Sequence, residues 1–245
     1  MSRNAWRILP LSCANGATQM AIDGAIFHGV ESGESPPTLR FYQWNPIAIS
    51  LGYHQRNYPN HWNGLTFLGE PVQLVRRPTG GRAVLHQGDL TYAVIASGFA
   101  DNRTESYRQI CEFLIQGWRS LSHDLSYGNA ERGYIHNPDC FATATGADLV
   151  LSTGQKLIGS AQQRSGQTIL QHGSMRLTPN PELFETVFGE TDRISNYPEM
   201  PTIDRIIDAL VDAAETCFDA SFSVGFLSDM EESWISQNLQ RNQIE

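Results

Sequence analysis

A turn rich in arginine and glycine, Arg76–His86 (RRPTGGRAVLH), most constrains how this chain can fold. Apolar, strand-like segments flank it on both sides, at residues 72–75 and 90–96. The adjacent Gly80 and Gly81 allow backbone conformations that other residues rarely adopt, and they let a ligand lie directly against the main chain. A β-hairpin turn with solvated charges is the simpler interpretation. The forked arginine donors and the histidine behind the turn favour contact with an anionic or polar ligand instead.

The composition is that of an ordinary globular protein. The sequence has 245 residues, of which 40% are hydrophobic and 18% are charged, which is enough for one large core or two small ones. No apolar run is long enough to cross a membrane, and the first residues lack the apolar segment of a secretory signal. The net charge of -9 disfavours a nucleic-acid partner. The cysteines are scattered, without metal-ligand or disulfide-framework spacing, so we expect a reducing, cytoplasmic setting.

The pattern of apolar residues predicts an α+β fold, with a mixed or antiparallel central β-sheet flanked by helices. No repeat or linker-like composition divides the chain, so we expect a single domain over residues 1–245, helical from about residue 181, with no separate accessory domain. The expected helices cover residues 15–30, 101–123, 181–188, 202–220 and 228–239. The expected strands after the turn are 89–96, 147–151, 156–162 and 168–175, and a pair of strands at 39–44 and 47–51 precedes it.

Two residues outside obvious core patterns could carry chemistry. Cys140 lies among turn residues, where a thiolate could act as a nucleophile, although a loop cysteine is by default incidental. Lys156 lies in a segment of small and apolar residues, where burial would disfavour its ammonium form and leave an amine able to exchange protons. The alternative for Lys156 is a strand-edge residue that discourages unwanted pairing. Cys111 and Cys217 fall in apolar helical patterns and are predicted core residues.

Small and polar residues follow in the later strands. Gly159, Ser160 and Ala161 would let a ligand chain or another backbone approach closely. His172 and Gly173 end a strand with polar groups, as the arginine–glycine turn does, although a histidine alone is more often structural. The sequence contains no paired-carboxylate, Walker, HExxH or Gly-x-Ser-x-Gly pattern, and no metal site is predicted.

Together these segments resemble the biotin/lipoate protein ligase catalytic-domain family. Arg76–His86 with Asp89–Tyr92 resembles the first family signature. Lys156–Gln162 with Leu170–Ser174 resembles the second, which in the family carries a lysine and lines the acyl pocket. The resemblance extends over residues 15–175 with both motifs in order, and it implies the class II biotin/lipoyl-ligase-like fold.

Within this family, the chain is most similar to the cysteine-dependent octanoyltransferase type. Cys140 precedes the Lys156 segment, and Arg82 stands where lipoate ligases commonly have a third glycine. The resemblance implies that an octanoyl group moves from acyl carrier protein, through a thioester on Cys140, to a lysine of a lipoyl domain or of the glycine-cleavage H protein. Lys156 would take up and return protons. The implied substrate-binding residues are Arg77, Gly80, Gly81, Arg82, His86, Gly159, Ser160, Ala161, His172 and Gly173.

Two other functions remain open from the sequence. In an ATP-dependent lipoate ligase, Cys140 would be incidental and Lys156 would contact an acyl-adenylate, so ATP and Mg²⁺ would be required. A non-catalytic module that binds lipoyl or acyl proteins would keep the pocket without turnover. The transferase itself is expected to need no cofactor, because transfer from a thioester to an amide is downhill. The residues after His86 and the spacer after Cys140, Gln87-Gly88 and Ala142–Thr145, depart from the family pattern.

Overall fold

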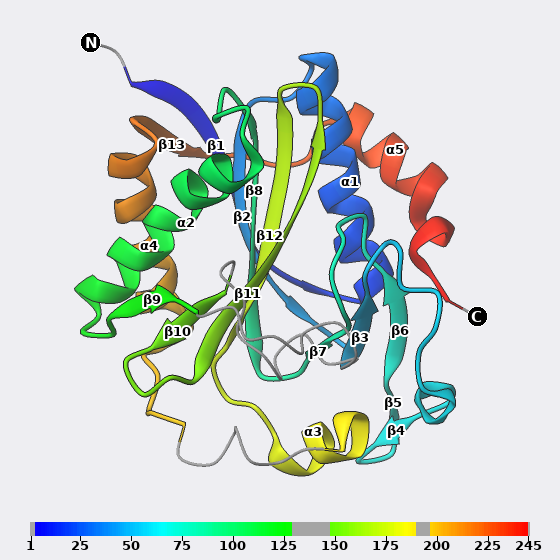
Figure 1. Ribbon diagram of the computed structural model, residues 1–245. Coiled ribbons are helices and arrows are strands. Elements are labelled where there is room, and N and C mark those ends of the chain that lie inside the picture. The colour runs from blue at the N-terminus through cyan, green and yellow to red at the C-terminus, as the bar shows by residue number, and fades with distance from the viewer. Residues whose placement is uncertain (1–2, 129–147, 190–196, 245) are drawn as a thin grey trace.

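The computed structural model describes residues 3–128, 148–189 and 197–244 (Figure 1). Its helices are α1 (Gly16–Ser32), α2 (Arg103–Ser120), α3 (Pro181–Phe188), α4 (Ile203–Cys217) and α5 (Asp229–Asn238), with short 3₁₀ helices η1 (Asn60–Trp62) and η2 (Leu239–Asn242). Its strands are β1 (Asn4–Ala14), β2 (Thr38–Trp44), β3 (Ala48–Leu51), β4 (Thr66–Phe67), β5 (Glu70–Pro71), β6 (Gln73–Arg76), β7 (Val84–His86), β8 (Asp89–Ser97), β9 (Leu125–Tyr127), β10 (Leu149–Leu151), β11 (Lys156–Ser165), β12 (Thr168–Arg176) and β13 (Ala220–Val224).

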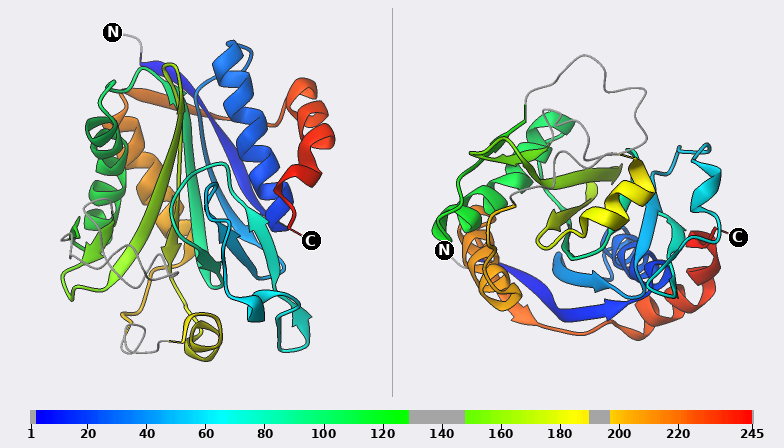
Figure 2. Two further views of the ribbon diagram at one scale, coloured as in Figure 1. Left: turned by 45° about the vertical axis from the view of Figure 1, so that its right-hand side comes forward. Right: turned by 90° about the horizontal axis from the view of Figure 1, so that it is seen from below.

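Two larger sheets, and a third sheet of only β4 and β5, organise these strands. The large sheet is mixed and has the strand order β13-β1-β2-β8-β12-β11-β10-β9, and a small sheet has the order β6-β3-β7. Helices α2 and α4 lie on one side of the large sheet, and α1 and α5 lie on the other (Figure 2). The arrangement is the α+β class predicted from the sequence, with helices flanking a mixed sheet.

Local signals at the helix ends explain where the long helices start and stop. The side chain of Asn15 accepts a hydrogen bond from the backbone N–H of Thr18 at the start of α1. Gly33 ends that helix in the left-handed conformation, with φ of 78°. Asn102 caps α2 in the same way, through the backbone N–H groups of Thr104 and Glu105. These polar and glycine residues lie at the ends of the predicted helical segments.

The arginine–glycine turn does not close a β-hairpin. Strand β6, before the turn, pairs in parallel with β3, whereas β8, after it, pairs with β2 and β12 in the large sheet. The expected pair of strands at 39–44 and 47–51 also divides, because β2 joins the large sheet and β3 the small one. Local sequence shows that strands exist, but long-range pairing decides which strands become neighbours. The turn therefore connects two strands of the small sheet, β6 and β7, which both pair with β3, and the chain passes to the large sheet after His86.

The C-terminal part is not entirely helical, contrary to the sequence prediction. Helix α4 ends at Cys217, and the chain then forms β13, which pairs in parallel with β1 along Asn4–Ile8. Neither strand was predicted. In β13 only Ala220 is fully buried, so its five residues show only a weak alternation of buried and exposed positions. In the sequence, such a segment is difficult to distinguish from a continuation of the preceding helix.

Two hydrophobic clusters cover the two faces of the large sheet. The cluster beneath α2 and α4 includes Tyr92, Phe113 and Trp118, and the cluster beneath α1 includes Met20 and Ile26. Cys111 is fully buried in the first cluster, as predicted, whereas Cys217 is partly buried and packs against it. The central strands are consequently covered on both faces.

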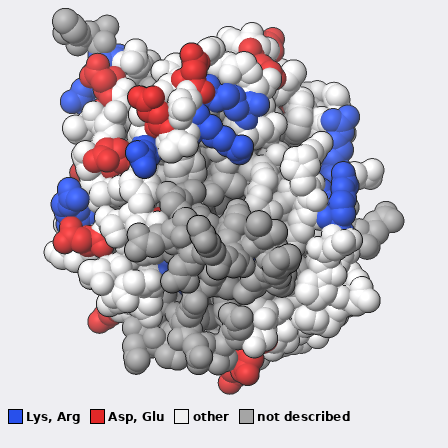
Figure 3. Space-filling model, in the orientation of Figure 1, with Lys and Arg blue, Asp and Glu red and all other residues white. Residues whose placement is uncertain are grey.

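The surface carries mixed charge. On the face shown in Figure 3, acidic and basic side chains lie beside one another over much of the upper left. One exposed pair joins Arg119 Nε to Asp124 Oδ1 at 3.3 Å, and such pairs contribute little to stability. Among the described helices, none is both long and apolar enough to span a bilayer.

A buried ion pair attaches the C-terminal helix to the first strand. Both oxygens of Glu231, on α5, accept hydrogen bonds from the Arg7 guanidinium of β1, at 2.6 and 2.8 Å. Glu231 also accepts from the Ser35 hydroxyl and the Ser228 backbone N–H. Burial by itself would raise the pKa of the Glu231 carboxyl, but the hydrogen bonds from Arg7, Ser228 and Ser35 lower it overall.

We expect Glu231→Gln to reduce the free energy of unfolding by about 3 kcal/mol at neutral pH, because it leaves the Arg7 guanidinium buried without its counter-ion. Since the folded-state pKa of Glu231 lies below its ordinary value of 4.5, its contribution is present above that pH and is lost as the pH falls further. Urea unfolding at pH 7 and pH 3 measures both effects. The exposed neighbour Glu232 supplies the control, Glu232→Gln. Equal losses in the two variants at pH 7 would contradict this account.

Candidate functional site

A cavity lies between the large and small sheets, beside the arginine–glycine turn. It contains about 420 Å³ of space not filled by atoms, including a part that opens to solvent. Its described lining consists of Met20, Tyr42, Trp44, Ser50, Arg77, Gly81, Val84, His86, Thr91, Gly159, Ser160, Ala161, His172, Gly173 and Ser174.

Most of the substrate-binding residues predicted from the sequence meet in this cavity. Segments far apart in the chain supply them: the turn, the strand pair β11–β12, and β7. Gly80 and Arg82 flank Gly81 in the turn but are not among the described lining residues. The predicted residues that line the cavity are Arg77, Gly81, His86, Gly159, Ser160, Ala161, His172 and Gly173.

Arg77 builds the turn as well as lining the cavity. Its guanidinium donates to the backbone carbonyls of Ser50, Gly80 and Arg82 at 2.6–2.8 Å. The neighbouring Arg76 donates in the same way to the carbonyl of Gly52, at 2.9 Å. Because these guanidinium groups satisfy backbone oxygens, they fix the shape of the loop that walls the cavity. From the sequence we expected the arginine donors to bind an anionic or polar ligand. In the structure, they also bind backbone carbonyls of the loop, which the sequence did not indicate.

Two glycines allow the turn to approach β3 closely. Gly81 has a φ of 98°, which residues with a side chain rarely adopt. A Cβ atom on Gly52 would lie 1.9 Å from the Gly81 backbone oxygen. The end of β3 and the turn are therefore in direct backbone contact.

A buried chain of hydrogen bonds joins α1, β12 and the turn; we call it the Thr79 link. Asp23 Oδ2 lies 2.8 Å from His172 Nδ1, and His172 Nε2 lies 2.6 Å from Thr79 Oγ1. Arg40 Nη1 and the Tyr42 hydroxyl also donate to the Asp23 carboxylate, both at 2.9 Å. Burial, and then the Asp23 charge, raises the pKa of Tyr42 far above its usual value, so Tyr42 remains a donor.

A second chain, the Ser50 link, joins β3, β7 and β8. Ser50 Oγ lies 2.8 Å from His86 Nε2, and His86 Nδ1 lies 2.8 Å from Asp89 Oδ2. The ring of Trp44 stacks on His86 with 3.8 Å between centroids. Burial lowers the pKa of His86 despite the Asp89 carboxylate, so the imidazole is neutral at pH 7. The Ser174 hydroxyl donates to Asp89 at 2.7 Å, which anchors the link to β12.

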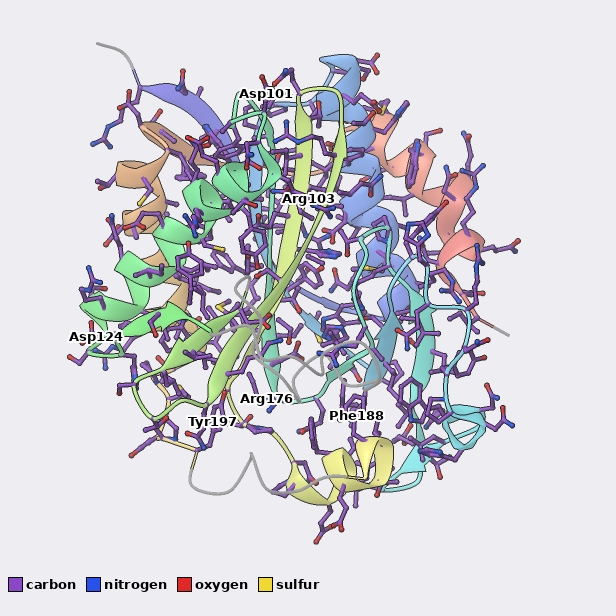
Figure 4. The ribbon with its side chains drawn as sticks, viewed as in Figure 1. Asp101, Arg103, Asp124, Arg176, Phe188 and Tyr197 are labelled. Carbon is purple, nitrogen blue, oxygen red and sulfur yellow. The ribbon has the colours of Figure 1, made fainter. Side chains whose placement is uncertain are left out.

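Lys156 begins β11 and forms a buried ion pair. Its Nζ lies 2.8 Å from Asp148 Oδ1, and both side chains are almost fully buried. The hydroxyl of Tyr197, which is labelled in Figure 4, donates to the Lys156 backbone carbonyl at 3.1 Å, where β11 begins. Lys156 is the only lysine in the sequence. It is not among the described residues that line the cavity, although Gly159 on the same strand is.

The other predicted catalytic residue, Cys140, lies outside the described residues. Two of the described cysteines have environments that differ from those of reactive thiols. Burial raises the pKa of Cys111 to about 12 and that of Cys217 to about 11. Cys13 is exposed on β1, away from the cavity lining. In the described ranges, no group of three or more His, Cys, Asp or Glu side chains is arranged to hold a metal ion.

The sequence reasoning missed several residues of the site. Asp23 and Tyr42 contribute to the Thr79 link, and Asp148 pairs with Lys156. A signal for Asp23 was present, since it interrupts the apolar run around Met20–Phe27. A carboxylate within a buried helix face needs a partner, and its partners come from distant strands.

Comparisons with known proteins identify the family of this chain. The model of a family described as the lipoyl protein ligase A/B catalytic domain matches residues 15–214. Octanoyltransferase LipM of Kyrpidia tusciae is 40% identical over 201 residues, which cover 77% of this chain and 72% of the relative. Octanoyltransferase LipM of Bacillus subtilis is 34% identical over 257 residues, which cover 97% and 92%.

Solved structures share the fold at lower identity. Lipoate-protein ligase A bound with ATP has a TM-score of 0.78 and 22% identity, with 97% of this chain and 95% of that chain covered. A bipartite lipoate protein ligase from Thermoplasma acidophilum, studied with its E2 lipoyl domain, has a TM-score of 0.76 and 22% identity, with 98% and 93% covered.

The chain belongs to the lipoyl protein ligase A/B catalytic domain family. The resemblance predicted from the two sequence motifs is confirmed, as are the α+β fold and the acyltransferase class. The octanoyltransferase relatives also support the predicted octanoyl transfer in lipoate biosynthesis. The solved ligases, at 22% identity, establish the fold alone.

We expect Gly52→Ala to reduce the free energy of unfolding by about 1–3 kcal/mol, because the new methyl group must displace the Gly81 backbone. Gly80→Ala is the matched control, since a Cβ there meets no atom within 4 Å. Its effect should stay within about 0.5 kcal/mol. Urea denaturation of both variants measures the difference. Similar values for the two would show that the turn does not contact β3 closely.

Proposed function

We propose that this protein transfers an octanoyl group from acyl carrier protein to a lysine of a lipoyl domain or of the glycine-cleavage H protein, in the cytoplasm. The observation that carries the proposal is its similarity to octanoyltransferases over nearly the whole chain. The acyl group would pass through a thioester on Cys140, with Lys156 managing the protons. The cavity beside Gly159 and Gly81 would hold the acyl tail.

The cavity walls support a bound hydrocarbon chain. Gly159 and Ala161 of β11 and Gly173 of β12 present little side-chain bulk, so a tail can lie against the strand backbones. Met20 contributes an adaptable apolar surface from α1. The polar groups of the two links have partners within the protein, so they need not bond to the ligand. A chain that offers dispersion contacts therefore suits the space.

In the first half-reaction, the Lys156 amine takes the proton of the Cys140 thiol. The product is a thiolate beside an ammonium, and the Asp148 carboxylate stabilises that ammonium at 2.8 Å. The thiolate attacks the carbonyl carbon of the octanoyl thioester, forming the new C–S bond. The bond to the pantetheine sulfur breaks, and the Lys156 ammonium gives its proton to that leaving thiolate.

In the second half-reaction, the neutral amine of the acceptor lysine attacks the thioester on Cys140. An amide bond forms, and Cys140 leaves as a thiolate. Lys156, now an amine, takes the proton that the attacking nitrogen loses, which restores the thiolate–ammonium pair. No bond energy from ATP is needed, since a thioester is converted to an amide. No cofactor is therefore included in this proposal.

An ATP-dependent ligase is the alternative function, because a lipoate ligase shares this fold. Lipoate-protein ligase A bound with ATP has the same fold at a TM-score of 0.78. Fold similarity does not decide chemistry within one superfamily. The similarity to octanoyltransferases at 34–40% identity favours the transferase. A lipoyl domain as acceptor is also consistent with the archaeal ligase studied with its E2 lipoyl domain.

Incubation with octanoyl-acyl carrier protein, without ATP, should add one octanoyl group to the enzyme. Hydroxylamine should remove the adduct, because it cleaves thioesters, and peptide mapping should place it on Cys140. Cys140→Ala should form no adduct, and Cys13→Ala should form it normally. Because Lys156 is the only lysine, a hydroxylamine-resistant amide could occupy only that side chain or the N-terminus. ATP-dependent lipoylation by Cys140→Ala at the wild-type rate would overturn the proposal.

Lys156→Arg should reduce transfer by about a hundredfold or more, since a guanidinium keeps the charge beside Asp148 but does not release its proton. The rate of octanoyl-enzyme formation measured by quenched flow tests this expectation. Thermal denaturation of the variant provides the control for folding. A folded Lys156→Arg protein with the wild-type rate would exclude proton exchange by Lys156.

A further inference from the structure

We propose that Asp23 and Thr79 determine the acyl-chain length that the cavity accepts, acting through His172 as positioning residues. The inference rests on the proposed acyl transfer and adds a specificity role to it. The small-sheet side of the cavity includes Arg77 and Gly81 of the turn, and the large-sheet side includes His172. The separation of these two sides sets the width available to the ligand.

The Thr79 link spans that separation through two short hydrogen bonds. Asp23 is fully buried and Thr79 is 1% exposed, so solvent does not compete for these bonds. A carboxylate only accepts, so His172 donates its Nδ1–H to Asp23. The other ring nitrogen, Nε2, lies 2.6 Å from the Thr79 hydroxyl and is joined to it by a hydrogen bond. The orientation of the His172 ring is therefore set by Asp23 of α1, and the ring in turn positions Thr79.

Other hydrogen bonds of Arg77 and Thr79 lie on the small-sheet side. The backbone N–H of Tyr53, after β3, donates to the Thr79 carbonyl at 2.8 Å. Arg77 donates to the carbonyls of Gly80 and Arg82 within the same turn. These contacts shape the turn but do not fix its distance from β12. The Thr79 hydroxyl supplies that connection, from the loop to a strand of the large sheet.

Asp23 is held rigidly enough to serve as the anchor. Its Oδ1 accepts from Arg40 of β2, and its Oδ2 accepts from Tyr42 of the same strand as well as from His172. The carboxylate is thus fixed to two strands of the large sheet and to α1. The Ser50 link joins the sheets at a different place, through His86 and Asp89. Loss of the Thr79 link should therefore loosen the turn without separating the sheets.

When the turn is fixed in place, it contacts the terminal atoms of the acyl tail and so limits the length of the tail. Packed protein walls tolerate little extra volume, so a longer chain meets a penalty when the wall cannot move. Discrimination between chains in an apolar pocket is about tenfold or more per methylene group. Loosening the turn should reduce this discrimination against longer chains. It should also weaken binding of the octanoyl chain, because fewer of its contacts persist.

Thr79→Val tests the proposal, since it removes the hydroxyl and nearly preserves the shape. We expect the ratio of kcat/KM for decanoyl over octanoyl donors to rise about tenfold. KM for the octanoyl donor should rise with little change in kcat, as expected for lost ground-state binding. Thr79→Ser keeps a hydroxyl and should keep the wild-type ratio. If Thr79→Val does not fold, Thr79→Ala makes the same comparison.

Hydrogen exchange of the free protein provides a readout that does not depend on activity. The Tyr53 amide, which donates to the Thr79 carbonyl, should exchange about tenfold faster in Thr79→Val than in Thr79→Ser, because one buried hydrogen bond that holds Thr79 is lost. An unchanged chain-length ratio in a folded Thr79→Val protein, with unchanged exchange, would overturn the inference. Faster exchange with an unchanged ratio would overturn the specificity role. Absence of octanoyl transfer by the wild type would instead contradict the proposed function.

Discussion

The hydrogen bonds between the two sheets are the interactions on which the site depends. Neither sheet alone forms the cavity: the small sheet supplies the turn, and the large sheet supplies β11 and β12. Asp23 and Asp89, both buried, each hold a histidine that reaches a hydroxyl on the small-sheet side. Buried carboxylates are unfavourable unless they are fully bonded, and here the bonds come from segments that are distant in sequence. Satisfying these charges brings the two walls of the cavity together.

The sequence predicted individual strands better than it predicted which strands pair with each other. Strands β11 and β12 and their small residues could be placed, because the apolar alternation and the glycine turn are local signals. The partners of β6 and β8 could not, since pairing depends on contacts between distant segments. Asp23 was missed for the same reason: one carboxylate in an apolar helix shows that a partner is needed, but not which one.

Family resemblance and geometry contribute different parts of the functional account. The motifs identified the family, and the comparisons confirmed it. The geometry adds that the sole lysine is buried against Asp148, so its ammonium form has a counter-ion. It also shows that Arg76 and Arg77 donate to backbone oxygens and that Arg77 lines the cavity. The predicted roles of Cys140 and Lys156 stay predictions that chemistry must test.

Single-turnover transfer from isolated octanoyl-enzyme most directly tests whether the enzyme works through an acyl intermediate. Octanoyl-enzyme would be purified free of acyl carrier protein and mixed with an unmodified lipoyl domain in the absence of ATP. The account predicts that octanoyl moves to the acceptor lysine as an amide, at a rate no slower than steady-state turnover, while the enzyme returns to its unmodified mass. An octanoyl-enzyme that stays loaded, or that transfers only when ATP is added, would contradict it.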